Sequence, residues 1–364
     1  MRTATGSARR RLGVALTPCL LAATLAAGQT APRYVLDPDW PRLPFGDRWL
    51  TGGLGGMCVD DRDHVFLLNR QNVEPEDLDG ARLAPPIIEL DREGRVVRGW
   101  GDPDRLGGRL HDCHVDADGH LWIVAAATGV VQQWTRDGGS LLRQIGDTGV
   151  YDSSDGTRRG RPMNSARPQF FLPASIDIDR ATGEIYVADG ELPGGNQRIA
   201  VLDDEGRFLR QWRLHRAEGE ETITPLPHCL RVSNDGLVYV CDRQADRIQV
   251  FDRTGAFVRN LDVPWRPVTP RDATRTGTRG SAVVLAFSPD TDQRLLFVVN
   301  QNTVMVDVVD RRSGDLVTSF GGGPGRYPGQ FTLPHGIGVD SRGNVYVAEQ
   351  EGRRIQRFRR VEAE

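Results

Sequence analysis

The chain repeats one structural unit six times, and this period limits its possible folds more than any other feature of the sequence. Each unit has an apolar strand, a turn rich in Asp and Gly, a β-branched strand, a polar loop, a third strand and a final turn with a fourth strand. In the fourth unit these parts are CLRVS, NDG, LVYVC, DRQADR, IQVFD, RTGA and FVRNLDV. The units cover residues 52–101, 109–149, 170–213, 225–263, 280–322 and 331–360. A period of roughly 40 residues is typical of propeller blades, so the sequence predicts an all-β, six-bladed β-propeller.

The last unit is incomplete, because it ends after RIQRFRRV and leaves no room for a good fourth strand. The segment RYVLDPDW at residues 33–40 precedes the first unit and has the pattern of a strand. We expect it to complete the sixth blade, since such a clasp closes the ring and covers sheet edges. An open solenoid, the alternative, would leave this segment without a role. No linker divides the repeats, so residues 31–364 are predicted to form one domain.

Residues 1–30 have the features of an export signal. Three arginines at positions 9–11 form a positively charged region, and residues 12–28 form an apolar run that ends in small residues. The alternative is a membrane anchor, but the run is short for a bilayer span and contains Pro18. We therefore predict cleavage of this segment and a secreted or periplasmic protein with no membrane attachment.

The charge balance excludes one large class of partners. The chain of 364 residues has a formal net charge of −3, whereas a domain that binds nucleic acid through its charge is strongly basic. Hydrophobic residues make up 38% of the chain, which is enough for a core but too few for a membrane protein. We expect a monomer with no nucleic-acid partner.

Four cysteines remain after the predicted cleavage, and an even number in an exported chain permits disulfides. They are Cys58, Cys113, Cys229 and Cys241. Cys229 and Cys241 flank the turn NDG at residues 234–236, so they should face each other across one hairpin. The pattern leaves open whether this pair forms a disulfide or packs as two small hydrophobic side chains.

Two insertions interrupt the period, at residues 147–169 and 264–280. Loops of this length in a compact domain are usually functional or mobile. They are expected to cover one face of the ring, with ordinary tolerated insertions as the alternative.

The histidines show a second regularity. Eight residues separate each of three histidines from the glycine of the following turn. The pairs are His111 and Gly119, His228 and Gly236, and His335 and Gly343. Each histidine stands at the entry to the innermost strand of the second, fourth or sixth unit. Alternate blades of a six-bladed ring are about 120° apart, and innermost strands line the central channel, so the three imidazoles should converge on the axis.

Three neutral imidazoles around one point form a good zinc site, with a fourth tetrahedral position left open to water or substrate. Cobalt, nickel or copper would accept the same ligands. The alternative is that each histidine is a hydrogen-bonded lining residue of the channel. Only 7 of the 364 residues are His, so three of them at one position of alternate units favours a site for Zn²⁺, or another divalent transition metal, at His111, His228 and His335.

The loop after the second strand of each unit should end near the same mouth of the channel. This loop carries Arg70 in the first unit and Arg243 in the fourth. A guanidinium group binds a carboxylate through two parallel hydrogen bonds. Both arginines are therefore candidates to hold the carboxylate of a small-molecule or peptide substrate above the metal. The alternative is a surface pair of Arg and Asp, which contributes little.

These motifs resemble a known enzyme family. The segments LHDCHVDADGHLWI, LPHCL, VCDRQADRIQVF and LPHGIGVDSRGNVYV are similar to the NHL-type blades of peptidyl-α-hydroxyglycine α-amidating lyase, over residues 33–361. The resemblance implies that the three histidines bind a catalytic zinc and that Arg70 and Arg243 line the site. It also implies a reaction that splits an N-acyl-α-hydroxyglycine into an amide and glyoxylate.

The sequence departs from this family at two positions. The family has a Tyr, thought to take part in proton transfer, where this chain has Glu191, so we assign the acid–base role to Glu191. The family also binds a structural calcium through an Asp directly after the third His and through two backbone carbonyl groups. Gly336 takes the place of that Asp, and the matching carbonyls belong to Met57 and Cys113. The resemblance thus implies a calcium (Ca²⁺) site without its carboxylate.

The chemistry of these residue types agrees with a lyase. A carbinolamide collapses when its hydroxyl loses a proton and the departing amide nitrogen gains one. A metal lowers the pKa of that hydroxyl, arginines fix the carboxylate and a general base or acid completes the set. One alternative is a non-catalytic NHL propeller scaffold that binds a protein or glycan. Another is a metal-dependent propeller hydrolase such as a lactonase, whose sites use carboxylates and Asn.

Overall fold

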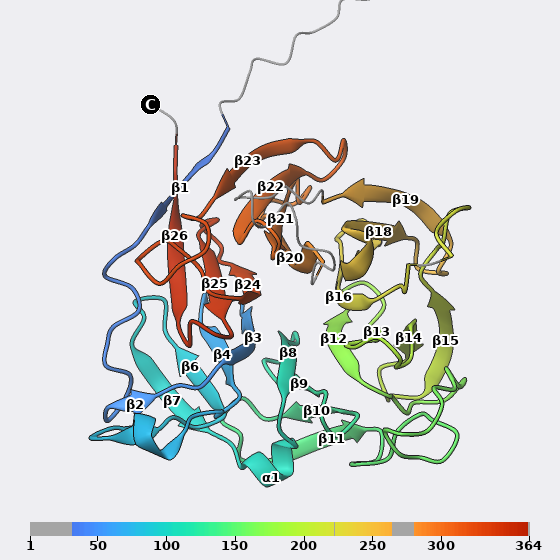
Figure 1. The fold of residues 1–364 in the computed structure, drawn as a ribbon, viewed down its shortest axis with the longest axis horizontal. Helices are drawn as coiled ribbons and strands as arrows, with labels where there is room; N and C mark the ends of the chain where they lie inside the picture. The colour runs from blue at the N-terminus through green and yellow to red at the C-terminus, as the bar shows by residue number, and fades with distance from the viewer. Residues whose placement is uncertain (1–30, 222, 264–279, 363–364) are drawn as a thin grey trace, which may run out of the picture. The chain divides into compact units, whose positions relative to one another are not determined.

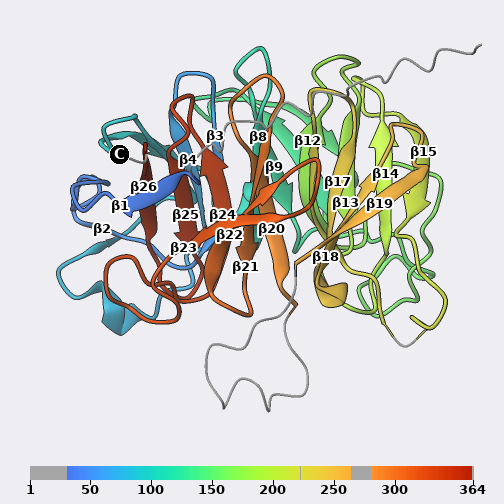
Figure 2. The ribbon, with the colours of Figure 1, turned by 90° about the horizontal axis from the view of Figure 1, so that it is seen from above.

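The computed structural model describes residues 31–221, 223–263 and 280–362, and Pro32–Glu364 form one compact unit. Within the described residues of this unit, six four-stranded antiparallel sheets surround a central axis (Figure 1). The innermost strand of each sheet contacts the innermost strands of both neighbouring sheets, so the ring closes. The side view in Figure 2 shows these strands standing next to one another. The prediction of an all-β, six-bladed propeller is confirmed.

The first three blades run from an innermost strand at the axis to an outermost strand at the rim. Blade 1 has, in that order, β3 (Leu54–Val59), β4 (Val65–Asn69), β6 (Ile87–Leu90) and β7 (Val96–Trp100). Blade 2 has β8 (Leu110–Val115), β9 (Leu121–Ala125), β10 (Val130–Trp134) and β11 (Leu141–Ile145). Blade 3 has β12 (Pro173–Ile178), β13 (Ile185–Asp189), β14 (Arg198–Leu202) and β15 (Phe208–Arg213).

The other three blades follow the same order. Blade 4 has β16 (Pro227–Val232), β17 (Val238–Asp242), β18 (Arg247–Phe251) and β19 (Phe257–Asp262). Blade 5 has β20 (Ala282–Phe287), β21 (Leu295–Asn300), β22 (Met305–Asp310) and β23 (Leu316–Phe320). Blade 6 has β24 (Pro334–Val339), β25 (Val345–Glu349), β26 (Ile355–Val361) and β1 (Arg33–Leu36).

Short helices and strands lie in the loops between these strands. They are β2 (Trp49–Leu50), which pairs in parallel with β5 (Arg82–Leu83), the 3₁₀ helices η1 (Pro75–Leu78) and η2 (Arg243–Ala245), and the helix α1 (Pro103–Leu106). No helix of the described residues is both long enough and apolar enough to span a bilayer. The predicted export signal at residues 1–30 lies outside the described residues.

The N-terminal strand closes the ring as the sequence predicted. Strand β1 pairs antiparallel with β26 and becomes the outermost strand of blade 6. The ring of Tyr34 stacks on Phe320 of blade 5, with a centroid distance of 4.7 Å. Beyond the strand, Asp37 Oδ2 accepts hydrogen bonds from Arg357 Nη2 at 2.6 Å and Nε at 3.1 Å. The clasp therefore combines strand pairing, aromatic packing and an ion pair.

The core consists of apolar layers between neighbouring blades. Successive side chains of a strand point to opposite faces, so one strand supplies two layers. On β4, Val65 and Leu67 pack in the cluster that contains Tyr346 of blade 6, whereas Phe66 packs in the cluster that contains Ile123 of blade 2. All five side chains are fully buried or nearly so. Burying one such side chain stabilises the fold by about 1.5–3 kcal/mol.

Two disulfides connect strands in the described part of the chain. Cys229–Cys241 joins the facing positions of β16 and β17, which settles the pairing that the sequence left open. Cys58–Cys113, which the spacing did not predict, joins the innermost strands of blades 1 and 2 across a sequence separation of 55 residues. A loop of that length predicts an entropic stabilisation of about 4 kcal/mol.

The insertion at residues 147–169 packs against blade 3. Asn164 Oδ1 accepts a hydrogen bond from the backbone N–H of Gln197 at 3.0 Å, and its backbone oxygen accepts one from Gln211 Nε2 at 2.8 Å. The insertion also contacts blade 2, because the hydroxyl of Tyr151 donates to the backbone oxygen of Ala127 at 2.7 Å, so it bridges two neighbouring blades. The second insertion, at residues 264–280, falls almost wholly outside the described residues, so its role as a cover stays a prediction.

Candidate metal centre

Three buried histidines meet on the propeller axis. His111, His228 and His335 are the second residues of β8, β16 and β24, the innermost strands of blades 2, 4 and 6. Their ring centroids lie 4.8–5.1 Å apart, and one nitrogen from each lies within 4.8 Å of the others. Their exposed fractions are 3%, 0% and 4%. The predicted convergence is confirmed; metal binding itself stays a prediction.

A β-bulge places each of these side chains. The strand register shifts at His111, His228 and His335, and it shifts at the equivalent positions of the other three blades. A bulge bends the strand and re-aims its side chain. The turn that follows each strand contains a glycine in the left-handed conformation, with φ of 81° at Gly119 and 80° at Gly236. This glycine lies at a fixed distance along the chain from the histidine. The eight-residue spacing therefore reflects one backbone shape repeated around the ring.

The odd-numbered blades fix the orientation of the three imidazoles. The Nδ1 atoms lie 2.6–2.9 Å from backbone carbonyl oxygens of the next blade. The pairs are His111 with Ala174, His228 with Val283, and His335 with Gly55. A carbonyl oxygen only accepts, so each Nδ1 carries the proton and each Nε2 keeps its lone pair. Such a hydrogen bond from Nδ1 is typical of histidines that bind a metal through Nε2.

Burial and nearby positive charge favour the neutral form of His228 and His335. Burial lowers the pKa of His228 well below its ordinary value, and the nearby charge of Arg243 lowers it further. Burial also dominates for His335, whose pKa is lowered as well by the charges of His111 and Arg70. The Nε2 atoms of His111 and His228 are buried and have no hydrogen-bond partner among the described residues. Neutral imidazoles with unused lone pairs are suited to bind a cation.

The space beside the histidines fits a single ion. A cavity of about 10 Å³ is lined by the three histidines and by residues that include Met57, Asp112, Ser175 and Arg231. That volume corresponds to roughly one water molecule or ion. Three neutral nitrogen ligands match the preference of zinc, so the residues present fit the predicted Zn²⁺ site.

The same residues do not fit the calcium ion that the family resemblance implies. Calcium takes about six to eight oxygen ligands, but Gly336 supplies no carboxylate. A Cβ atom at Gly336 would lie 3.0 Å from Cγ of Met57, so a longer side chain has little room there. The neighbouring carboxylate of Asp112 is bound by Arg231 through two hydrogen bonds of 2.9 and 3.0 Å. The positive charge of Arg231 therefore already neutralises the carboxylate of Asp112.

The two predicted arginines lie beside the histidines. Arg70 directly follows β4, and Arg243 directly follows β17. Arg70 Nε donates to the backbone oxygen of Leu110 at 3.3 Å, while its buried Nη2 has no hydrogen-bond partner in the described part of the protein. Arg243 Nη2 donates to Gln301 Oε1 at 2.5 Å. Their role in substrate binding stays a prediction.

A third arginine, Arg109, was not predicted from the sequence. It stands two residues before His111 in a left-handed conformation with φ of 42°. With Arg70 it lines a cavity of about 40 Å³ between blades 1 and 2. Burial and the charge of Arg109 together lower the pKa of Arg70 to about 10. Two guanidinium groups that face one cavity form a good environment for an anion. Nothing in the repeat marks Arg109, because the other units have different residues there.

Glu191 lies at the edge of the histidine cluster. Its Oε1 accepts a hydrogen bond from Arg109 Nη2 at 2.5 Å and lies 3.3 Å from Nε2 of His111. The residue is 3% exposed, and its Oε2 has no hydrogen-bond partner among the residues that the structure describes. Burial would raise the pKa of Glu191, but the neighbouring basic groups, among them the guanidinium of Arg109, outweigh it and hold the pKa below its ordinary value. The carboxylate is therefore ionised.

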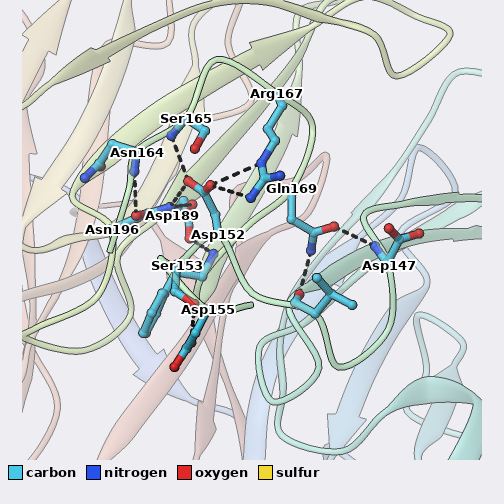
Figure 3. Close-up of polar contacts among 12 residues, drawn as sticks. Asp147, Asp152, Ser153, Asp155, Asn164, Ser165, Arg167, Gln169, Asp189 and Asn196 are labelled. Atoms are coloured by element: carbon cyan, nitrogen blue, oxygen red, sulfur yellow. Dashed lines mark hydrogen bonds and ion pairs between the residues drawn. The ribbon is translucent and has the colours of Figure 1, made fainter. Parts of the chain in front are cut away.

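Asp152, Asp189 and Asn196 belong to a buried polar network (Figure 3), and this network is linked to the backbone of Glu191. Asn196 Nδ2 donates to Asp152 of the long insertion at 2.9 Å and to Asp189 at 2.7 Å. Asp189 in turn accepts a hydrogen bond from the backbone N–H of Leu172 at 3.0 Å. The backbone oxygen of Leu172 accepts the N–H of Glu191, also at 3.0 Å. The insertion thus helps to position the carboxylate near the three histidines.

A second group of potential ligands lies in the turn between β8 and β9 and comprises Asp116, Asp118 and His120. Asp116 closes this turn by accepting the N–H groups of Asp118 and His120 at 3.1 and 2.9 Å. Its other oxygen accepts hydrogen bonds from Trp122 and Gln133. This carboxylate is therefore engaged in the fold.

Comparison with known proteins agrees with this architecture. A family model described as NHL repeat matches residues 224–251, which span β16, β17 and β18. The chain thus carries a match to the NHL repeat in blade 4 of a six-bladed β-propeller. Two solved propellers share its fold at low sequence identity. A streptogramin B lyase has a TM-score of 0.51 at 13% identity and covers 91% of this chain and 97% of its own. The virginiamycin B lyase of Staphylococcus aureus has a TM-score of 0.50 at 15% identity, covering 86% and 85%.

Relatives of this NHL propeller include enzymes and proteins named only for the repeat. Peptidyl-glycine alpha-amidating monooxygenase B of Xenopus laevis is 25% identical over 360 residues, covering 90% of this chain and 36% of the relative. NHL repeat-containing protein 3 of Mus musculus is 25% identical over 337 residues, covering 90% and 84%. The chain thus spans about a third of the length of the amidating enzymes that it resembles.

Proposed function

We propose that this NHL propeller is a metal-dependent carbon–nitrogen lyase that cleaves an N-acyl-α-hydroxyglycine-like carbinolamide to an amide and glyoxylate. The observation that carries the proposal is the cluster of three buried imidazoles beside a carboxylate and arginines. The similarity to amidating monooxygenases over 90% of this chain supports it too. The propeller fold shared with two lyases is compatible with it.

The arginines would hold the free carboxylate of the substrate. Arg70 and Arg109 line one cavity, and Nη2 of Arg70 has no acceptor among the described residues. A bidentate hydrogen bond from a buried guanidinium orients a carboxylate as well as binding it. Arg243, on the opposite side of the ring in blade 4, would contact the rest of the substrate. The expected substrate is therefore a small molecule or peptide that ends in a carboxylate.

The three histidines would hold the zinc ion, which supplies a Lewis acid that lowers the pKa of the substrate hydroxyl. Glu191 is ionised and lies 3.3 Å from His111 Nε2, so it can accept the hydroxyl proton. As the C=O bond of glyoxylate forms, the C–N bond breaks and its electron pair passes to nitrogen. Glu191 then returns the proton to that nitrogen, which gives the neutral amide.

The test is to load the purified protein with zinc and measure glyoxylate release from N-benzoyl-α-hydroxyglycine. The methyl ester of the same compound is the matched control, because it lacks only the carboxylate charge. We expect turnover of the acid, much slower turnover of the ester, and no turnover by His335→Ala. If neither compound releases glyoxylate while zinc is bound, the lyase proposal is wrong and a non-catalytic scaffold is favoured.

We also propose that the protein acts as a monomer outside the cytoplasm. The disulfides Cys58–Cys113 and Cys229–Cys241 are consistent with an oxidising compartment. N-terminal sequencing of protein secreted from an expression host would test this, since cleavage before residue 32 is expected.

A further inference from the structure

Three buried hydrogen-bond acceptors in and beside the histidine cluster have no donor among the described residues. They are Nε2 of His111, Nε2 of His228 and Oε2 of Glu191. A buried acceptor without a donor is destabilising, and more so when it is charged. A set of such acceptors is stable when a cation binds to all of them. We propose that Glu191 is the fourth protein ligand of the metal, so that the resting site is a closed set of three histidines and one glutamate.

The position of the carboxylate agrees with shared ligation. Two atoms bound to one zinc ion at about 2.0–2.1 Å and a tetrahedral angle lie about 3.4 Å apart. Oε1, the oxygen of Glu191 that Arg109 holds, lies 3.3 Å from His111 Nε2, so the carboxylate group that carries the unused Oε2 stands next to this nitrogen. The backbone of Glu191 is fixed, because its N–H donates to Leu172 and the neighbouring buried network holds that strand. The carboxylate therefore lies beside His111 without any movement of the backbone at Glu191.

Arg109 supports this role as a positioning residue. Its Nη2 holds Oε1 of Glu191 at 2.5 Å and leaves Oε2 unused. Carboxylate ligands of metals are commonly hydrogen-bonded in this way by a second residue. Arg109 also lines the proposed carboxylate cavity with Arg70. A substrate carboxylate that binds Arg109 would compete with Glu191 for the same guanidinium and loosen the fourth ligand.

The proposal deepens the proposed function and rests on it. The substrate hydroxyl would replace Glu191 at the metal, and the displaced carboxylate would accept the proton of that hydroxyl. The same proton later passes to the departing nitrogen, so no further reactant is needed. The closed resting site would keep water and simple anions from the metal until a substrate with a carboxylate binds.

The test uses Co²⁺ as a spectroscopic probe in the full-length protein. Cobalt affinity is measured by competition with a chelator, and azide is then added to the cobalt-loaded protein to detect an open coordination position by visible absorption. We expect the wild type to show no azide-dependent change. Glu191→Gln should bind cobalt about 10²–10³-fold more weakly and should respond to azide. Glu205→Gln, at an exposed turn, is the matched control and should behave as the wild type.

Each outcome separates the two proposals. An azide response in the wild type, or unchanged cobalt affinity in Glu191→Gln, would overturn the role of Glu191 and leave the metal-dependent lyase intact. Failure of the wild type to bind cobalt or zinc would overturn both. If Glu191→Gln does not fold, Glu191→Asp takes its place, because it keeps the negative charge on a side chain that is shorter by one methylene. The azide experiment on the wild type remains decisive in either case.

Discussion

Replacing His228 by alanine should weaken metal binding without unfolding the propeller. The imidazole is fully buried, and its Nδ1–H donates to the backbone oxygen of Val283 at 2.8 Å. Its removal leaves that carbonyl without this donor, which costs about 1–3 kcal/mol. The variant also no longer buries an Nε2 atom that lacks a partner among the described residues. These effects oppose each other. The free energy of unfolding of the metal-free variant should therefore differ from that of the metal-free wild type by no more than about 1 kcal/mol.

The effect on metal affinity should be much larger. A structural zinc site contributes about 10–16 kcal/mol from about four ligands, which is about 3–4 kcal/mol per ligand. Since about 1.4 kcal/mol is a tenfold change, His228→Ala should bind zinc about 10²–10³-fold more weakly. The same loss should appear as a smaller zinc-dependent increase in the free energy of unfolding.

The assay is a zinc titration by chelator competition, followed by urea unfolding with and without zinc. His215→Ala is the matched control, because His215 is exposed and its ring stacks on Phe257, away from the three-histidine cluster. We expect the control to bind zinc as the wild type does. Equal zinc affinity of His228→Ala and the wild type would refute the three-histidine site. If metal-free His228→Ala does not fold, the claim that the propeller folds without the His228 side chain is refuted.

Other parts of the molecule give further predictions. Burial would raise the pKa of Asp37, but Arg357 holds it below its ordinary value. The clasp should therefore stabilise the fold above the unfolded-state pKa of about 3.9 and weaken as the pH falls through the lower folded-state pKa. Urea unfolding at several pH values should show this loss, and Asp37→Asn should lack it. Replacing Cys58 and Cys113 together by serine should lower the free energy of unfolding by about 4 kcal/mol; no change would mean that the disulfide constrains little. Arg70→Ala should raise KM for an acidic substrate about 10–100-fold, whereas KM for its methyl ester should hardly change.

The repeat made most of the fold predictable. Strand-and-turn periodicity depends on local sequence, since each blade needs its own alternating apolar strands and its own turn glycines. The same register placed His111, His228 and His335 at one height, because identical units in a closed ring must point equivalent residues at the axis. The clasp of β1 on β26 followed from a missing strand and an unused one. The three histidines, Arg70 and Arg243 could thus be brought together from the sequence.

Other features depend on contacts between blades, which the repeat does not record. Cys58 and Cys113 stand in different units, and only the packing of β3 against β8 brings them within disulfide reach. Arg109 has no counterpart in the other units, so its ion pair with Glu191 appears only when blades 2 and 3 are side by side. The sequence by itself determined the ring and the cluster of three histidines, because both follow from a local pattern repeated in register. Tertiary structure alone decided what surrounds those histidines, because residues from different blades meet only once the ring has closed.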